Sequence, residues 1–221
     1  MNQTRRIAAL TAVVLFGALL ATACGGSNDD DGNGSENGDG TAPEYLGAVI
    51  APPPSMPEAI LLDENGEEFD LQEETDGYVT LLYVGYTHCP DICPTHLHEI
   101  DVALRQLDED VASKVKVIMA TADPERDTPE QLKQYLDSFN ESFVGLTGPR
   151  ELMDQFQVAL GLQPATRTDI GNGNYTVNHA AYVMAFTPDD RLAHLVYPSG
   201  MGMREWLNDL PLLVEKGYDP E

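Results

Sequence analysis

The chain has 221 residues, and its 37 aspartate and glutamate residues far outnumber its 12 lysine and arginine residues, so the formal net charge is −25. Nucleic acids are bound mainly through lysine and arginine contacts to phosphate groups, and this charge therefore argues against nucleic acid as a partner. The acidic excess fits two explanations, solubility or electrostatic steering of basic partners and cations, and both stay open at the level of composition.

The first 23 residues have the pattern of an export signal. Arg5 and Arg6 precede an apolar run at residues 7–20, and the small residues 21–23 are followed by Cys24. A cysteine at this place resembles the lipobox of bacterial lipoproteins, in which the cysteine is acylated and becomes the first residue of the mature chain. We therefore expect a lipid anchor at Cys24, on the outer face of the bacterial cytoplasmic membrane. Free secretion and an uncleaved helical anchor are the alternatives, although the run is short for a bilayer span.

Residues 24–43 differ in composition from the rest of the chain. They are rich in glycine, asparagine and acidic residues and contain no large apolar residue. Such a segment cannot form a core, so we predict a flexible acidic tether. Residues 44–221 are long enough for one well-buried domain, which the tether would hold close to a membrane.

Short apolar runs alternate with segments of helical spacing from residue 59 onward. Residues 59–63 and 67–71 flank an Asn-Gly turn, which predicts a β-hairpin. After it we expect strands at 79–84, 115–120, 143–146, 179–186 and 192–196, helices at about 91–109, 128–139, 150–160 and 202–215, and a turn-rich loop at 165–178. This order predicts the α/β class, with a single thioredoxin-like domain that has an N-terminal hairpin and an inserted strand–helix element.

Two cysteines lie where the strand at 79–84 meets the following helix. A spacing of four residues places Cys89 and Cys93 on one face of the first helical turn, with Cα atoms about 6 Å apart. Free backbone N–H groups at a helix start stabilise a thiolate. The pair therefore suits either a disulfide, when oxidised, or two thiolates that bind one soft metal ion. Two inert core thiols are the simpler explanation, but they would not need a strand-to-helix turn.

Three sequence blocks together resemble the Sco/SenC family of copper proteins, which take part in the assembly of cytochrome oxidase. Residues 85–94 read GYTHCPDICP, residues 123–129 read DPERDTP, and residues 175–179 read YTVNH. The resemblance covers the domain from about 44 to 215 and implies that Cys89, Cys93 and His179 bind copper. Asn178 departs from the pattern, because the family usually has an acidic residue directly before this histidine.

The chemistry of these three side chains agrees with copper. Thiolates are soft ligands that select Cu(I), and an imidazole completes a trigonal set for Cu(I) or Cu(II). A closed zinc site needs a fourth protein ligand, and the chain has no fourth cysteine to supply it. The resemblance therefore implies a membrane-tethered metallochaperone that delivers copper to the binuclear copper centre of cytochrome c oxidase subunit II, or to another copper protein.

Two other functions remain open. The cysteine pair could make the chain a thiol–disulfide reductase that acts on the oxidase cysteines, or a redox or copper sensor. A general oxidoreductase is disfavoured, because thioredoxin has C-x-x-C where this chain has C-x-x-x-C. Formation of a Cys89–Cys93 disulfide would abolish copper binding, so a thiol reductase is implied as a further partner.

Several other histidine, aspartate and methionine residues are weaker candidates for the site. His88 could lower the pKa of the adjacent Cys89 or help in copper transfer, but a half-exposed surface residue is the simpler interpretation. The remaining candidates have structural explanations that are at least as good: helix-face, strand, turn, cap or packing roles for His96, His98, His194, Asp123, Asp127, Met201 and Met203.

Overall fold

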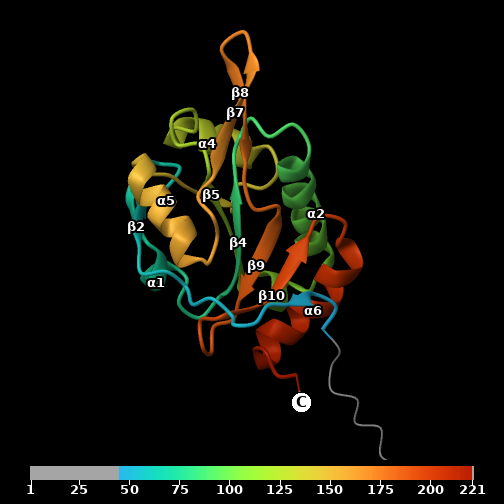
Figure 1. Ribbon diagram of the computed structural model, residues 1–221. Helices are drawn as coiled ribbons and strands as arrows, with labels where there is room; N and C mark the ends of the chain where they lie inside the picture. Colours follow the sequence, from blue (N-terminus) through green and yellow to red (C-terminus); the bar gives the residue numbers. More distant parts are fainter. Residues whose placement is uncertain (1–44, 221) are drawn as a thin grey trace, which may run out of the picture. The chain divides into compact units, whose positions relative to one another are not determined.

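The computed structural model describes residues 45–220, which form an α/β domain (Figure 1). The strands are β1 (Ala48–Val49), β2 (Ile60–Leu62), β3 (Glu68–Asp70), β4 (Val79–Gly85), β5 (Val115–Thr121), β6 (Val144–Leu146), β7 (Thr166–Gly171), β8 (Asn174–Asn178), β9 (Tyr182–Phe186) and β10 (Ala193–Pro198). The helices are α1 (Leu71–Glu74), α2 (Ile92–Gln106), α3 (Glu109–Ala112), α4 (Pro129–Asp137), α5 (Arg150–Ala159) and α6 (Met203–Lys216).

A six-stranded sheet in the order β1-β10-β9-β4-β5-β6 forms the centre of the domain. Strands β4, β5 and β6 are parallel, whereas β9 runs antiparallel to both of its neighbours. In Figure 1, α2 and α6 lie to the right of β4, and α5 lies with β2 to its left. Every residue of β4 is buried, as expected for a central strand covered on both faces. The carboxyl end of this strand leads into the turn that carries the cysteines.

The predicted thioredoxin-like fold is confirmed, including the N-terminal hairpin β2–β3 with its turn at Gly66, where φ is +81°. The other predicted elements agree with the structure to within a few residues, whereas β1 and α1 were not predicted. The predicted helix at 91–109 was too long: α2 ends at Gln106, and the separate short helix α3 follows it.

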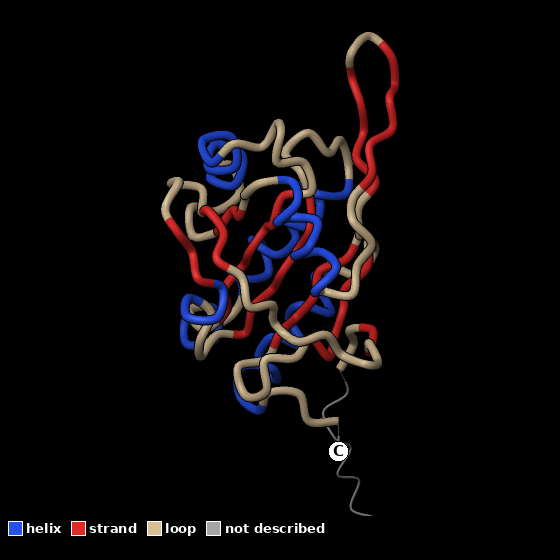
Figure 2. The backbone as a smooth tube through the Cα atoms, turned by 60° about the vertical axis from the view of Figure 1, so that its left-hand side comes forward, coloured by secondary structure: helices blue, strands red, loops and turns tan. Residues whose placement is uncertain are grey.

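The segment predicted as a turn-rich loop at 165–178 is instead the hairpin β7–β8, which projects from the domain (Figure 2). Its turn uses three consecutive residues with positive φ, Gly171, Asn172 and Gly173. The prediction was wrong because both faces of β7 are exposed, so the strand lacks the apolar alternation that normally identifies one. The predicted strand at 179–186 also begins later, at Tyr182, so His179 lies in the connection between β8 and β9.

The predicted export signal, Cys24 and the acidic tether lie outside the described residues. Within residues 45–220, none of the helices is long and apolar enough to cross a membrane. The two ends of the described chain lie close together. The Tyr45 hydroxyl donates to the Gly217 carbonyl, and the Tyr45 ring packs on Tyr218.

Candidate metal centre

The two cysteines are held by the junction between β4 and α2. Cys93 lies in the first turn of α2 and is fully buried, whereas Cys89 in the preceding turn is 9% exposed. The backbone N–H of Cys93 donates to Cys89 Sγ at 3.4 Å. Both side chains are free thiols. The two sulfur atoms lie close together as predicted, but the prediction that both cysteines share the first helical turn was wrong, because α2 begins at Ile92 and Cys89 lies in the turn before it.

The core beneath the cysteines is shaped to receive the Cys93 sulfur. Tyr83 and Gly85, two residues apart in β4, lie on the same face of the strand. The Tyr83 hydroxyl donates to Cys93 Sγ at 3.2 Å. A Cβ atom on Gly85 would lie 2.6 Å from Cε1 of Tyr83 and 3.2 Å from Cys93 Sγ. Only a residue without a side chain leaves room for this arrangement.

His179 approaches the sulfurs from the other side of the site. Its Nε2 atom lies 3.7 Å from Cys93 Sγ, and its Nδ1 atom lies 2.9 Å from the Ala180 carbonyl oxygen. A carbonyl oxygen can only accept, so this contact favours the tautomer with the proton on Nδ1. The Nε2 lone pair is then available for a metal. The rings of Tyr83 and Tyr86 pack edge-on against the imidazole, at centroid distances of 5.9 and 5.5 Å.

The structure brings together the three residues that the sequence singles out. One ligand atom from each of Cys89, Cys93 and His179 lies within 4.8 Å of the other two. Two sulfurs and one imidazole nitrogen form a soft donor set suited to copper. Within residues 45–220, no fourth histidine, cysteine or carboxylate joins this group, so it is not the closed four-ligand arrangement of a structural zinc site.

The two thiols have different acidities. The pKa of Cys89 is lowered to about 4, chiefly because the Cys93 thiol donates a hydrogen bond to it, with the backbone N–H groups of Asp91 and Cys93 acting in the same direction. The pKa of Cys93 is raised, because burial disfavours its thiolate and because it stays protonated as the donor to Cys89. Without a metal, Cys89 is the thiolate and Cys93 is the thiol.

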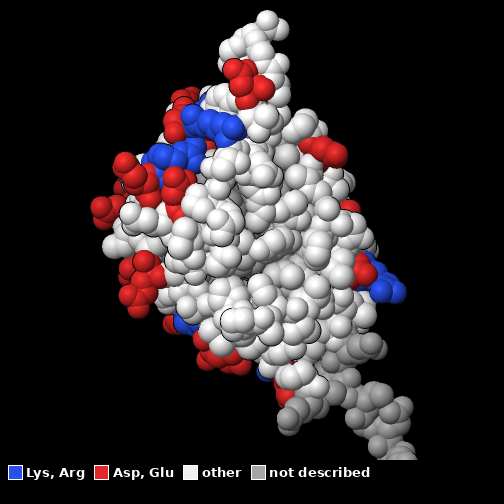
Figure 3. All heavy atoms as spheres, in the orientation of Figure 1, with Lys and Arg blue, Asp and Glu red and all other residues white. Residues whose placement is uncertain are grey.

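Ion pairs and a tyrosine hydroxyl fasten the β7–β8 hairpin, which leads to His179, to the rest of the domain. The buried Asp123 carboxylate accepts from the Tyr175 hydroxyl at 2.9 Å and pairs with Arg126 and Arg167. Both guanidinium groups also lie over the Tyr175 ring. Basic side chains gather just below the hairpin in Figure 3. Asp123 therefore positions the segment that carries His179.

Asp127 fixes the turn that leads into Cys89. Its buried carboxylate accepts from the backbone N–H and the hydroxyl of Thr87 and from the Thr121 hydroxyl. The Thr87 oxygen in turn lies 3.0 Å from Nδ1 of His88. Asp127 therefore holds the backbone of the turn before Cys89 in place. This agrees with the prediction that Asp127 has a role in a turn.

The other predicted candidates lie outside the three-residue group. His96 is buried and His98 is exposed, which agrees with their positions on different faces of α2. Burial lowers the pKa of His96 because it disfavours the charged imidazolium. The rest have other contacts: His88 is half-exposed, His194 bonds to Asp190, Met201 packs against the core and Met203 accepts from Gln106.

Tyr83 and Gly85 are the site residues that sequence reasoning missed. Both lie in an apolar strand, where each residue is naturally assigned to the core. The signal was their position, because alternate residues at the end of β4 share the face on which the cysteines lie.

Comparison with known proteins agrees with this site. The sequence model of the family described as SCO1/SenC matches residues 55–211. A Stutzerimonas stutzeri protein described as copper-binding is 39% identical over 140 residues, which cover 62% of this chain and 67% of that protein.

Solved structures with the same fold include relatives of this family. The structure of Bradyrhizobium japonicum ScoI with copper bound is 33% identical, with a TM-score of 0.65 over 72% of this chain and 99% of that one. BsSco, described as a member of the Sco family of cytochrome c oxidase assembly proteins, is 19% identical, with a TM-score of 0.58 over 76% of this chain and 98% of that one. At this lower identity the likeness concerns the fold alone.

Proposed function

Because the chain belongs to the SCO1/SenC family, we propose that it binds copper through Cys89, Cys93 and His179 and passes it to a copper protein of a respiratory oxidase. The observation that carries this proposal is the convergence of two sulfurs and one imidazole nitrogen within 4.8 Å. Two thiolates favour Cu(I), and the imidazole makes Cu(II) acceptable as well. Three protein ligands, of which His179 is half-buried, suit a metal that must be released again.

The expected recipient is subunit II of cytochrome c oxidase, whose binuclear copper centre would receive the metal. The three sequence blocks that resemble a family of cytochrome oxidase assembly proteins, together with membership of the SCO1/SenC family, support this partner. The net charge of −25 would favour encounters with basic surfaces or with copper ions themselves.

Anchoring at the outer face of the bacterial cytoplasmic membrane completes the proposal. An acylated Cys24 followed by the acidic segment 24–43 would keep the domain near a membrane-bound oxidase. Mass spectrometry of the mature protein tests this point. An N-terminal lipid on Cys24 and partition into the membrane fraction are expected, whereas an unmodified N-terminus in the soluble exported fraction would contradict the anchor.

Copper titration of the reduced domain tests the ligand set. We expect one copper ion per wild-type domain and none in the Cys89→Ala, Cys93→Ala double variant. His179→Ala should weaken Cu(II) binding more than Cu(I) binding, because two thiolate ligands are sufficient to bind Cu(I). The matched control is His98→Ala, which removes an exposed imidazole from the same helix as Cys93. Stoichiometric copper in the double variant would refute the proposed ligands.

Thiol–disulfide exchange is the second candidate function, and the unequal acidity of the cysteines favours it. Cys89 is the thiolate that could attack a disulfide of the recipient, and Cys93 could then displace the recipient thiolate and form the Cys89–Cys93 disulfide. The recipient gains two electrons and this chain loses two. Copper loading of the oxidised and the reduced protein, measured beside turnover with a disulfide substrate and an added reductase, separates the two functions.

A further inference from the structure

We infer that Tyr83 is a positioning residue for the metal: its hydroxyl group, by donating a hydrogen bond to Cys93 Sγ, shifts the preference of the site from Cu(II) toward Cu(I). This inference rests on the proposed copper site and adds to it a residue that sets which oxidation state of the metal is favoured. Tyr83 does not bind the metal itself, and it gains or loses neither an electron nor a proton.

The hydroxyl group is held in place by the fold. Tyr83 is only 1% exposed, and its oxygen lies 3.2 Å from Cys93 Sγ. Its ring contacts the imidazoles of His96 and His179, at centroid distances of 5.2 and 5.9 Å. The missing side chain at Gly85 leaves the space that the ring and the sulfur share. The hydrogen bond therefore does not depend on a mobile surface group.

This hydrogen bond changes character when a metal is bound. Cys93 must lose its proton to act as a ligand, and its thiolate is a stronger acceptor than its thiol. A hydrogen bond to the sulfur withdraws electron density that would otherwise be donated to the metal. Cu(II) depends more on this donation than Cu(I), so the bond disfavours Cu(II), as hydrogen bonds around cysteine sulfur do in other copper sites.

The two sulfurs do not receive the same support. Cys89 Sγ accepts from the backbone N–H of residue 93, and any residue except proline would supply this donor. Cys93 Sγ also has a backbone donor, the N–H of Tyr86, but it accepts in addition from the Tyr83 side chain, which substitution can remove. Packing alone would be satisfied by phenylalanine at position 83, because the ring and not the hydroxyl group fills the core. The hydroxyl is therefore the part of Tyr83 that requires a separate explanation.

Tyr86 offers a matched comparison within the same site. Its ring packs edge-on against His179 in the same way, at 5.5 Å and 79° compared with 5.9 Å and 78° for Tyr83. Its hydroxyl oxygen, however, accepts from the Val177 backbone N–H at 3.5 Å. Removing either hydroxyl keeps an aromatic ring beside the histidine, and only the Tyr83 substitution removes a donor to sulfur.

The experiment compares wild type, Tyr83→Phe and Tyr86→Phe in the reduced domain. Cu(I) and Cu(II) affinities are measured by competition with chromophoric ligands, together with the sulfur-to-Cu(II) charge-transfer absorption. In Tyr83→Phe we expect the ratio of Cu(I) to Cu(II) affinity to fall about threefold to tenfold, the range for one hydrogen bond. The absorption should move to longer wavelength. Tyr86→Phe should change both values less than Tyr83→Phe does.

Two outcomes would overturn the inference: an unchanged affinity ratio in Tyr83→Phe, or the same change in both variants. Failure of wild type to bind copper would instead refute the proposed function. The Cu–S stretching band of the Cu(II) protein provides a second measurement. In the wild type it should shift on transfer to D2O, because the Tyr83 hydroxyl proton and the Cys93 N–H proton that faces Cys89 Sγ both exchange. The shift should be smaller in Tyr83→Phe, and an equal shift in the two proteins would contradict the Tyr83 hydrogen bond.

Discussion

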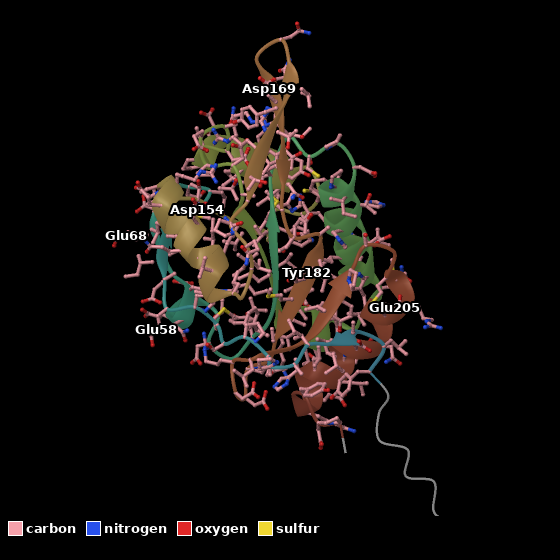
Figure 4. The ribbon with its side chains drawn as sticks, in the orientation of Figure 1. Glu58, Glu68, Asp154, Asp169, Tyr182 and Glu205 are labelled. Atoms are coloured by element: carbon pink, nitrogen blue, oxygen red, sulfur yellow. The ribbon has the colours of Figure 1, made fainter. Side chains whose placement is uncertain are left out.

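The two halves of the metal centre are held by different kinds of interaction. The cysteines lie at the end of the fully buried strand β4, and their positions depend on close packing with Tyr83 and Gly85. His179 follows an exposed hairpin, which is held to the domain mainly by ion pairs to Asp123 and by a tyrosine hydroxyl that donates to Asp123. In Figure 4, Asp169 lies on the projecting hairpin, whereas Tyr182 at the start of β9 lies in the central sheet.

This difference predicts unequal freedom of movement within one site. Cys89 and Cys93 form the sulfur half of the centre, and His179 with the hairpin before it forms the histidine half. A change in the sulfur half also disturbs the core, on which the stability of the domain depends. The histidine half can move through local opening, because few buried apolar contacts hold the hairpin. A site built in this way can open on one side, and so release a metal, without unfolding. Four measurements test the comparison.

The largest expected effect concerns the acidity of Cys89 in the sulfur half. Because its pKa is lowered to about 4, Cys89 is already a thiolate at pH 6, and its alkylation rate should stay flat between pH 6 and pH 8. Cys93→Ala removes the main hydrogen-bond donor, so the pKa should rise and the rate should increase at least tenfold over the same range.

Cys93→Ser is the matched control for this measurement. The serine hydroxyl can still donate to Cys89, so its profile should remain close to flat. A profile that rises with pH in the wild type would show that Cys89 is protonated, and it would remove the distinction between the two thiols.

The next effect tests the packing beneath the sulfurs. Gly85→Ala places a Cβ atom 2.6 Å from the Tyr83 ring, and overpacking of this kind typically costs about 1–3 kcal/mol of unfolding free energy. Urea unfolding measures the loss, and copper titration should show a weakened site. Gly148→Ala is the control, because its new Cβ would lie 3.6 Å or more from its neighbours. Equal stability of the two variants would mean that the core does not confine Cys93.

The sequence predicts the sulfur half of the centre better than the histidine half. The cysteine pair combines local signals, namely an apolar strand, a four-residue spacing and a helical pattern. The hairpin gives no such signal, because its strands are mostly exposed and only Val177 is buried. The placement of His179 beside the cysteines rested on the family resemblance, since a contact across 86 residues has no local pattern. Tyr83 was missed because an apolar sequence pattern does not show whether a tyrosine hydroxyl contacts a metal ligand or the tyrosine only fills the core.

A smaller effect is expected when the attachment of the hairpin to Asp123 is loosened. Tyr175→Phe removes the hydroxyl that donates to Asp123, at a cost of about 0.5–1.5 kcal/mol in local stability. Amide exchange in β7 and β8 should speed up about twofold to tenfold, and Cu(II) affinity should fall while Cu(I) affinity changes less. Tyr135→Phe is the control, because its buried hydroxyl has no hydrogen-bond partner among the described residues. Faster exchange throughout β4 would show that the hairpin is part of the core after all.

The smallest effect concerns the far end of the hairpin, and it compares the same chemical change in two places. Ile170 in β7 is 61% exposed, whereas Ile118 in β5 is fully buried. Ile118→Val removes one methylene from a packed interior and should cost about 0.5–1.5 kcal/mol of unfolding free energy. Ile170→Val removes the same group from a surface that stays in water, so its urea midpoint should match the wild type. If both substitutions cost the same, Ile170 must be packed against a surface that folds together with the domain. The histidine half would then be as firmly held as the sulfur half, and its freedom to open would be lost.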